Sequence, residues 1–245
     1  MLIAAIVFAA AISMMLVELL APGRSWAKVK GWWLRALALN GVQAAMVFVA
    51  GVTWDIWLDG IALFDSQALF GHYGSVLFGY LAVTFIYYWW HRARHALPFL
   101  WRWVHQLHHS PQRLEIITSF YKHPVEIAFN SFLSSFILYF LCGLQPDAAV
   151  LTILITGLAE LFYHWNVRTP FWLGFIFQRP ESHCIHHKRG WHSQNYSDLP
   201  IWDMLFGTFH NPRRFDGDCG FTDDREARLG EMLLGRDVNR SKADQ

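Results

Sequence analysis

The sequence predicts an all-α integral membrane protein, a bundle of about five spanning helices with a histidine-rich layer on its cytoplasmic side. Three observations support this fold class. Of the 245 residues, 54% are hydrophobic and only 16% are charged, which is too few charges for an ordinary soluble domain of this size. The apolar residues gather in five stretches long enough to cross a bilayer. All the basic residues fall on one side of those stretches.

Each apolar stretch can cross the membrane as a helix, since a helix rises about 1.5 Å per residue and the hydrocarbon core is about 30 Å thick. The first stretch covers 1–21, where a cleaved signal peptide is the alternative. Its length and the lack of basic residues before it weigh against cleavage. The later stretches cover about 36–54, 73–90, 125–143 and 148–164, and the tight turn "CGLQPD" joins the last two.

The basic residues test this count of five spans. If the helices cross in alternation, the segments 22–35, 91–124 and 165–245 share one side, and 55–72 and 143–147 share the other. All 20 Lys and Arg residues fall on the first side and none on the second. The positive-inside rule then places the N-terminus outside and the long C-terminal part in the cytoplasm. The same sorting argues against the alternative of a soluble all-helical core.

Composition also narrows the partners and the compartment. The net charge of +1 gives no reason to expect nucleic acid as a partner. The three cysteines, Cys142, Cys184 and Cys219, have no paired spacing. They therefore predict neither a disulfide framework nor a cysteine zinc site.

The histidines are the strongest signal of chemistry. Three clusters, "HRARH" at 91–95, "HQLHH" at 105–109 and "HCIHH" at 183–187, hold eight of the 13 histidines. On a helix the positions i, i+3 and i+4 share a face, so the histidines of each cluster can point the same way. They are His91, His95, His105, His108, His109, His183, His186 and His187.

Clustered imidazoles of this number predict a metal centre. Neutral imidazole suits iron and zinc, whereas magnesium and calcium prefer carboxylate oxygens. Eight histidines exceed the four positions of one tetrahedral zinc, so two metals follow more naturally. The fold class is thereby completed as a membrane helical bundle with a cytoplasmic histidine-rich metal-binding layer.

With these motifs the chain resembles the fatty acid hydroxylase and sterol desaturase superfamily of integral membrane oxygenases. The resemblance covers about 73–210 and rests on "HRARH", "VHQLHHS", "KHPVE", "YHWN" and "HCIHHKRGWHSQNYSDLPIWDMLFGTF", in that family's order. At Ser197 the family commonly has glycine. We therefore divide the chain into membrane helices with an outer loop at 1–72, a catalytic domain at 73–210 and a charged, surface-lying tail at 211–245.

The resemblance implies that the eight clustered histidines are iron ligands. His164, in "YHWN", matches a further family histidine and is expected as a ninth ligand. His123 in "HPVE" and His192 before "NYS" match family positions with a supporting role.

Three further residues are expected to support the ligands. Asn166 and Asn195 belong to the matched segments "YHWN" and "NYS". Glu160 lies one turn before His164 on the same helical face, so its carboxylate is predicted to orient a ligand N–H group. Glu126 and Glu115 are weaker candidates for that role.

As an activity, the resemblance implies a non-haem di-iron oxidoreductase that uses O2 to hydroxylate or desaturate a lipid, such as a sterol or a fatty acyl chain. It implies two iron ions, O2 as co-substrate and a separate ferredoxin- or cytochrome-type electron donor. We expect that donor on the basic face around Arg92, Arg94 and Arg102. The alternatives are a metal-dependent membrane hydrolase and a non-enzymatic metal- or lipid-binding membrane protein.

Overall fold

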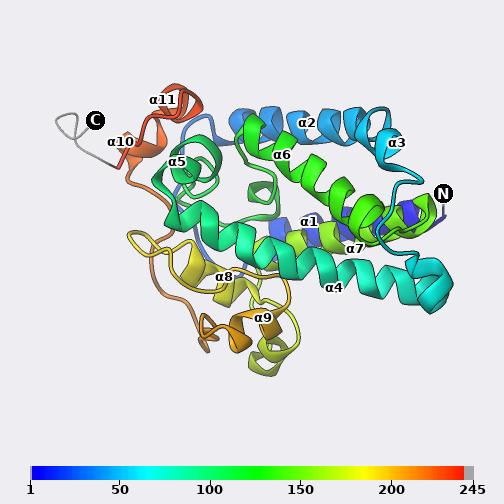
Figure 1. Cartoon of the computed structure of the whole chain (residues 1–245). Helices are drawn as coiled ribbons and strands as arrows, with labels where there is room; N and C mark the ends of the chain where they lie inside the picture. Colours follow the sequence, from blue (N-terminus) through cyan, green and yellow to red (C-terminus); the bar gives the residue numbers. More distant parts are fainter. Residues whose placement is uncertain (1, 240–245) are drawn as a thin grey trace.

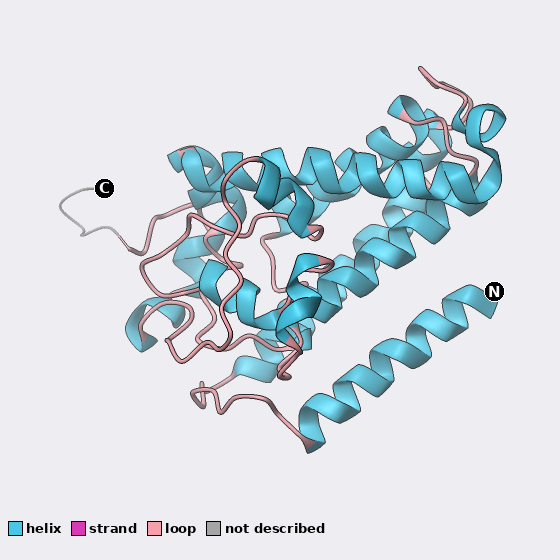
Figure 2. Ribbon diagram, turned by 90° about the horizontal axis from the view of Figure 1, so that it is seen from below, coloured by secondary structure: helices cyan, strands magenta, loops and turns pink. Residues whose placement is uncertain are grey.

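The computed structural model describes residues 2–239, and in that range it contains helices, turns and loops without a strand (Figure 2). This confirms the all-α prediction. The long helices, shown in Figure 1, are α1 (Leu2–Leu20), α2 (Trp32–Gly51), α4 (Ser66–Ala96), α6 (Pro124–Ser135) and α7 (Pro146–His164). The short helix α3 (Trp54–Leu58) follows α2, and the π-helix η3 (Phe136–Leu141) continues α6.

Among the described residues, four helical segments are long and apolar enough to cross a membrane. They are Trp32–Leu58, Ser66–Ala96, Pro124–Leu141 and Pro146–His164. A shorter apolar helix, Ala5–Leu20, corresponds to the first predicted span. The predicted bundle of about five apolar helices is therefore confirmed, and the chain is an integral membrane protein.

Packing between the long helices explains how the bundle holds together. α4 lies along α7, and α2 lies along α6. Val83 of α4, Ile137 of η3 and Ala148 of α7 are buried together in this bundle core. At the turn between η3 and α7, Gly143 has a φ of +60°, and a Cβ there would lie 1.8 Å from the carbonyl oxygen of Phe64. Only glycine fits this position.

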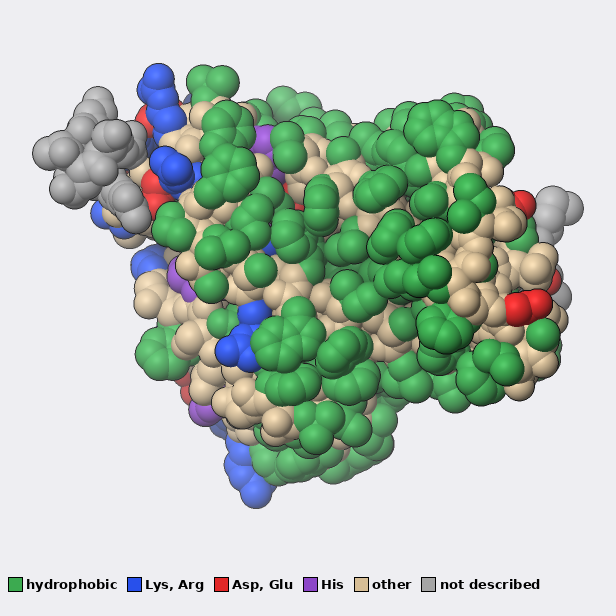
Figure 3. All heavy atoms as spheres, in the orientation of Figure 1, with side chains coloured by type: hydrophobic (Ala, Val, Ile, Leu, Met, Phe, Trp, Pro, Cys, Tyr) green, Lys and Arg blue, Asp and Glu red, His purple; other side chains and the backbone are tan. Residues whose placement is uncertain are grey.

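The surface of the bundle is apolar, as expected of helices that face lipid. Large side chains such as Phe8, Phe48, Trp57 and Leu77 are exposed on it. In Figure 3 hydrophobic side chains cover most of the visible bundle, which extends to the right. Lys and Arg side chains gather in the left half of the view. An apolar belt of this extent is stable only in contact with lipid or another apolar surface.

Shorter elements form a cap at the end of the bundle that carries the basic residues (Figure 1). They are α5 (Pro98–Leu100), the π-helix η1 (Trp101–His105), the 3-10 helices η2 (Ile116–Thr118) and η4 (Phe171–Phe175), α8 (Pro180–His186), α9 (Pro200–Leu205), α10 (Asp223–Glu226) and α11 (Leu229–Leu233). One core of this cap buries Trp32, Leu107, Tyr121 and Met232. The bundle thus ends in a packed cap.

The C-terminal segment is part of this cap, which corrects the expectation of a surface-lying tail for its described part. The backbone N–H of Phe221 donates to the carbonyl of Ser110 (3.0 Å), and that of Gly220 donates to the carbonyl of His187 (3.0 Å). Met232 and Val238 are fully buried. The segment therefore lies against the ends of two histidine clusters. It packs into the cap because apolar residues stand between its charged ones. Residues 240–245 of the predicted tail lie outside the described residues.

Candidate metal centre

Nine histidines converge where the long helices meet the cap. They come from the last turns of α4 (His91 and His95), from η1 and the turn after it (His105, His108 and His109), from the end of α7 (His164), and from α8 and its C-terminal cap (His183, His186 and His187). The helical hairpin of α6, η3 and α7 leaves the cap and returns to it, so it brings the second and third clusters together. The π-helix η1 lies directly at this site, a common place for such turns.

The nine imidazoles divide into two groups, and the potential ligand atoms of each group lie within 4.8 Å of one another. The first group contains His91, His95, His105, His109 and His186. The second contains His108, His164, His183 and His187. Among the described residues these are the two such groups, and both consist of histidine alone.

Each HxxHH cluster contributes to both groups. "HQLHH" gives its i and i+4 histidines, His105 and His109, to the first group and His108 to the second. "HCIHH" gives His183 and His187 to the second group and His186 to the first. The rings of His109 and His187 stack with their centroids 4.2 Å apart, so the two groups are in direct contact.

The Nδ1 atoms of several rings face hydrogen-bond acceptors on the protein. Nδ1 of His91 lies 2.7 Å from the carbonyl of Tyr196, and Nδ1 of His186 lies 2.7 Å from that of Gln194. Nδ1 of His164 lies 2.9 Å from the carbonyl of Glu160. Because a carbonyl can only accept, these Nδ1 atoms carry the proton of the neutral ring. Their Nε2 atoms are then free to bind a metal.

The Nε2 atoms face one another at close range. In the first group, Nε2 of His105 lies 3.0 Å from that of His91 and 3.2 Å from that of His109. In the second group, Nε2 of His183 lies 3.2 Å from that of His164 and 3.1 Å from that of His187. Nδ1 of His91 and Nδ1 of His105 both face oxygen acceptors, so the facing Nε2 atoms of these two rings both present lone pairs, which repel at 3.0 Å unless a cation lies between them. The donor set of the first group therefore fits a metal ion, and the ring nitrogens of the second group lie close enough together to hold another.

His95 supports the same conclusion. Both of its ring nitrogens are buried without a hydrogen-bond partner. A buried polar atom without a partner costs free energy, about 1–3 kcal/mol. A metal bond to one of these nitrogens would remove part of that cost.

Burial also keeps the histidines of the cap in their neutral form. It lowers the pKa of His105, His108 and His109 well below the usual 6.5, and neighbouring positive and imidazole groups lower it further. The pKa of His186 falls to about 3 for the same main reason, burial. Neutral imidazole is the form that binds metals, so the site is prepared for ligation at neutral pH.

One carboxylate reaches a ligand ring directly. Oε1 of Glu126 lies 3.0 Å from Nδ1 of His105, and the same oxygen forms a buried ion pair with Arg94. Glu126 is in the first turn of α6, where the helix dipole favours a negative charge. The sequence analysis ranked Glu126 below Glu160. The signal in favour of Glu126 was its place two residues after His123–Pro124, a pair that marks the start of α6 and so puts Glu126 in the first turn of that helix.

Glu160 and His123 make different contacts from those expected. The Glu160 carboxylate pairs with Lys122, and only its backbone carbonyl accepts from His164. His123 is the N-cap of α6: its Nδ1 accepts from the N–H of Val125 at 3.1 Å. Their supporting role toward a metal stays a prediction.

The remaining supporting residues lie around the site. His192 stacks on the ring of His95, with 5.8 Å between centroids. Asn195, at a φ of +56°, holds the loop after α8 through hydrogen bonds to Ser182 and His210. Asn166 joins the end of α7 to the segment after α1 through Arg24. Sequence reasoning missed Gln178, whose amide lies 2.6 Å from Nδ1 of His183.

The comparisons with known proteins agree with this geometry. The family model described as fatty acid hydroxylase matches residues 76–208, and the chain belongs to that family. The chain is 37% identical over 155 residues to the ornithine lipid hydroxylase of Rhizobium tropici (60% of this chain, 46% of the relative). It is 30% identical over 134 residues to the alkylglycerol monooxygenase of Homo sapiens (53% and 29%).

A further relative is the sphingolipid C4-hydroxylase of Schizosaccharomyces pombe, 25% identical over 140 residues (56% of this chain, 48% of the relative). The matched region thus spans less than half the length of each of these relatives. All three are named as lipid hydroxylases or monooxygenases. No solved structure matches the chain.

Proposed function

We propose that this protein is a membrane-bound non-haem di-iron oxidoreductase that uses O2 to hydroxylate or desaturate a lipid. The observation that carries the proposal is the division of nine histidines, eight buried and His95 partly buried, into groups of five and four at the membrane end of the cap. The names of the relatives support a lipid as substrate.

In this proposal the first group holds one iron ion and the second group holds the other. When bound, the two irons would activate O2 for attack on an unactivated C–H bond. The protein itself keeps the imidazoles of the cap neutral by burial. It fixes the rings of His91, His186 and His164 through Nδ1, at the carbonyls of Tyr196, Gln194 and Glu160. The Glu126 carboxylate fixes His105 in the same way.

Two alternatives are less well supported. A metal-dependent hydrolase site usually includes carboxylate ligands, and neither group contains one. A non-enzymatic metal- or lipid-binding protein would explain the histidines equally well. The relatives, however, are named as hydroxylases and monooxygenases.

The orientation and the electron donor belong to the same proposal. The sorting of all 20 basic residues supports an outside N-terminus and a cytoplasmic cap. A separate ferredoxin- or cytochrome-type donor would dock on the cytoplasmic face near Arg92 and Arg102. Arg94, predicted to be part of that docking face, is buried against Glu126 and is not available to a partner.

Metal analysis and O2 dependence test the proposal. We expect about two iron ions per chain after purification with reductant, and O2 consumption with a lipid. The variant His108→Ala should lose iron and activity while it still inserts into the membrane. His72→Ala is the matched control, because His72 lies at the far end of α4 beside Asp147. Turnover with zinc and without O2, or full activity of His108→Ala, would contradict the proposal.

A further inference from the structure

Two elements of the cap expose an unusual amount of apolar surface. Residues 171–177, "FWLGFIF", form η4 and the two residues after it, and they contact α9. Trp172 is 61% exposed and Leu205 is 64% exposed. We call six of the exposed apolar side chains of these two elements the interfacial patch; they are Trp172, Phe175, Ile176, Phe177, Ile201 and Leu205. In Figure 3 hydrophobic side chains also cover the lower edge of the molecule.

The patch adjoins the membrane-facing side of α4. The ring of Trp202, in α9, lies 5.0 Å from that of Phe85 between centroids. The ring of Phe206 lies 4.8 Å from that of Trp89. Phe85 and Trp89 are themselves partly exposed on α4. The apolar surface of the spanning helix therefore continues without a break onto α9.

The depth of this contact follows from the length of α4. The helix is kinked at Gly71, and a core about 30 Å thick takes about 20 residues of helix, which reaches the region of His91. The first basic residue of α4 is Arg92. Phe85 lies about two turns before Arg92, at the depth of the hydrocarbon rather than of water. Side chains that pack on Phe85 lie at that depth too.

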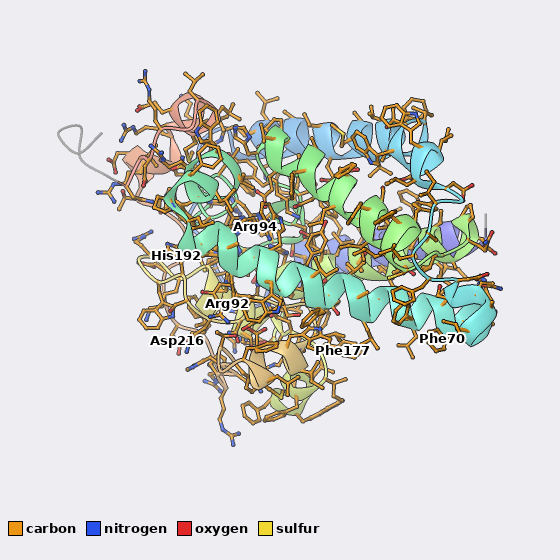
Figure 4. The ribbon with its side chains drawn as sticks, viewed as in Figure 1. Phe70, Arg92, Arg94, Phe177, His192 and Asp216 are labelled. Atoms are coloured by element: carbon orange, nitrogen blue, oxygen red, sulfur yellow. The ribbon has the colours of Figure 1, made fainter. Side chains whose placement is uncertain are left out.

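Arginine side chains mark the edge of the patch. Arg92 lies over the ring of Trp89 at 5.1 Å, and the exposed Arg213 lies over the ring of Phe171 at 4.8 Å. Cations at the rim of an apolar surface can reach lipid phosphates while their stems stay on the apolar side. Along the direction of α4, Figure 4 places Phe177 between Arg92 and Phe70, on the membrane side of Arg92.

We propose that the interfacial patch inserts into the membrane leaflet next to the histidine layer, beside α4, and so holds the cap against the bilayer. Surface segments with aromatic and aliphatic side chains on one side and cations at the rim bind membranes in this way. The occupant of the patch is lipid, because the patch continues the lipid-facing side of α4 at the same depth. This inference does not depend on the chemistry of the histidines.

Site-directed fluorescence tests the insertion. Trp172→Cys and Leu205→Cys, in two different elements, are each labelled with a bimane dye in the full chain and reconstituted in phosphatidylcholine and phosphatidylglycerol liposomes. The native cysteines are buried, and the unsubstituted protein measures their background labelling. Trp191→Cys is the matched control, since Trp191 is a similarly exposed aromatic beside Lys188 and Arg189.

We expect doxyl-labelled lipid to quench the dyes at 172 and 205 at least twofold more strongly than the dye at 191, and aqueous iodide to show the reverse order. Equal quenching of all three dyes by iodide would overturn the proposal. Protection of the patch dyes from both quenchers would also overturn it, because a protein partner would then cover the patch. If one substitution prevents folding, the other position still decides the outcome.

Discussion

Replacing Glu126 by glutamine tests how the buried carboxylate stabilises the site. Glu126 is fully buried, and its side chain is shared between Arg94, which is 6% exposed, and Nδ1 of His105. Glutamine keeps the size of the side chain and removes its charge. The guanidinium of Arg94 is then left in the protein interior without a counter-charge.

The expected loss follows from this burial. Removing one partner of a buried ion pair costs about 3–5 kcal/mol of unfolding free energy, because the other charge stays desolvated. Glu126→Gln should therefore destabilise the protein by about that amount. The double variant Glu126→Gln with Arg94→Met should recover most of the loss, since no unpaired charge remains. Because the support of His105 is weakened, iron affinity should fall about 10–100-fold in both variants.

The assay separates the two effects. Unfolding free energies come from titration with sodium dodecyl sulfate in mixed micelles, and iron affinity comes from competition with a chelator. A cost below about 1 kcal/mol for Glu126→Gln would show that the ion pair does not act as described. Iron affinity equal to that of the parent protein would refute the link between Glu126 and His105.

Three further outcomes are expected. If the groups bind separate ions, His95→Ala should reduce the iron content by about one per chain in elemental analysis; unchanged or completely lost iron would contradict the division. The iron-free protein should lose stability as the pH falls below about 6.5. Its buried histidines have a lower pKa in the folded protein than in the unfolded chain, about 3 for His186, so below pH 6.5 the unfolded chain binds more protons and is favoured. Each such histidine contributes about 1.4 kcal/mol per pH unit, and thermal melting at pH 7.5 and 5.5 measures the sum. Gly190 and Gly220 both have a positive φ, so alanine at Gly190 should cost about 1–2 kcal/mol of stability. Gly220→Ala should cost clearly more, because a Cβ at Gly220 would lie 2.1 Å from the carbonyl oxygen of Pro111, whereas the space around Gly190 is open. Equal melting temperatures of the two glycine variants would show that this contact relaxes freely.

The helical bundle could be predicted from the sequence because a membrane imposes simple demands. A spanning helix must be apolar over about 20 residues, and basic residues remain on one side. The predicted spans at 73–90 and 148–164 fall within α4 and α7. The cap is different: residues 211–239 read as charged, but Phe221 and Met232 are buried between the charges. Packing of that kind leaves no periodic pattern.

Eight of the nine histidines were found from their spacing, since i, i+3 and i+4 positions share a helical face. His164 was expected from the resemblance of "YHWN" to a family segment. The division of the nine into two groups could not be predicted in this way, because the spacing within "HQLHH" is also compatible with a single group. The structure assigns His108 to one group and its neighbour His109 to the other, according to which helices lie opposite each ring. Such partners are set by helix packing over long sequence distances.

By itself, the sequence determined the membrane bundle, the sorting of its basic residues away from two of its loops and the eight histidines of the three clusters, because hydrophobicity and helical periodicity are local properties. Only the tertiary structure decided that backbone carbonyls and Glu126, rather than the Glu160 carboxylate, face the Nδ1 atoms of the rings. It also decided that Arg94 is buried. Every residue has a backbone carbonyl, so which carbonyl faces a given histidine ring depends on how the chain folds back around the site.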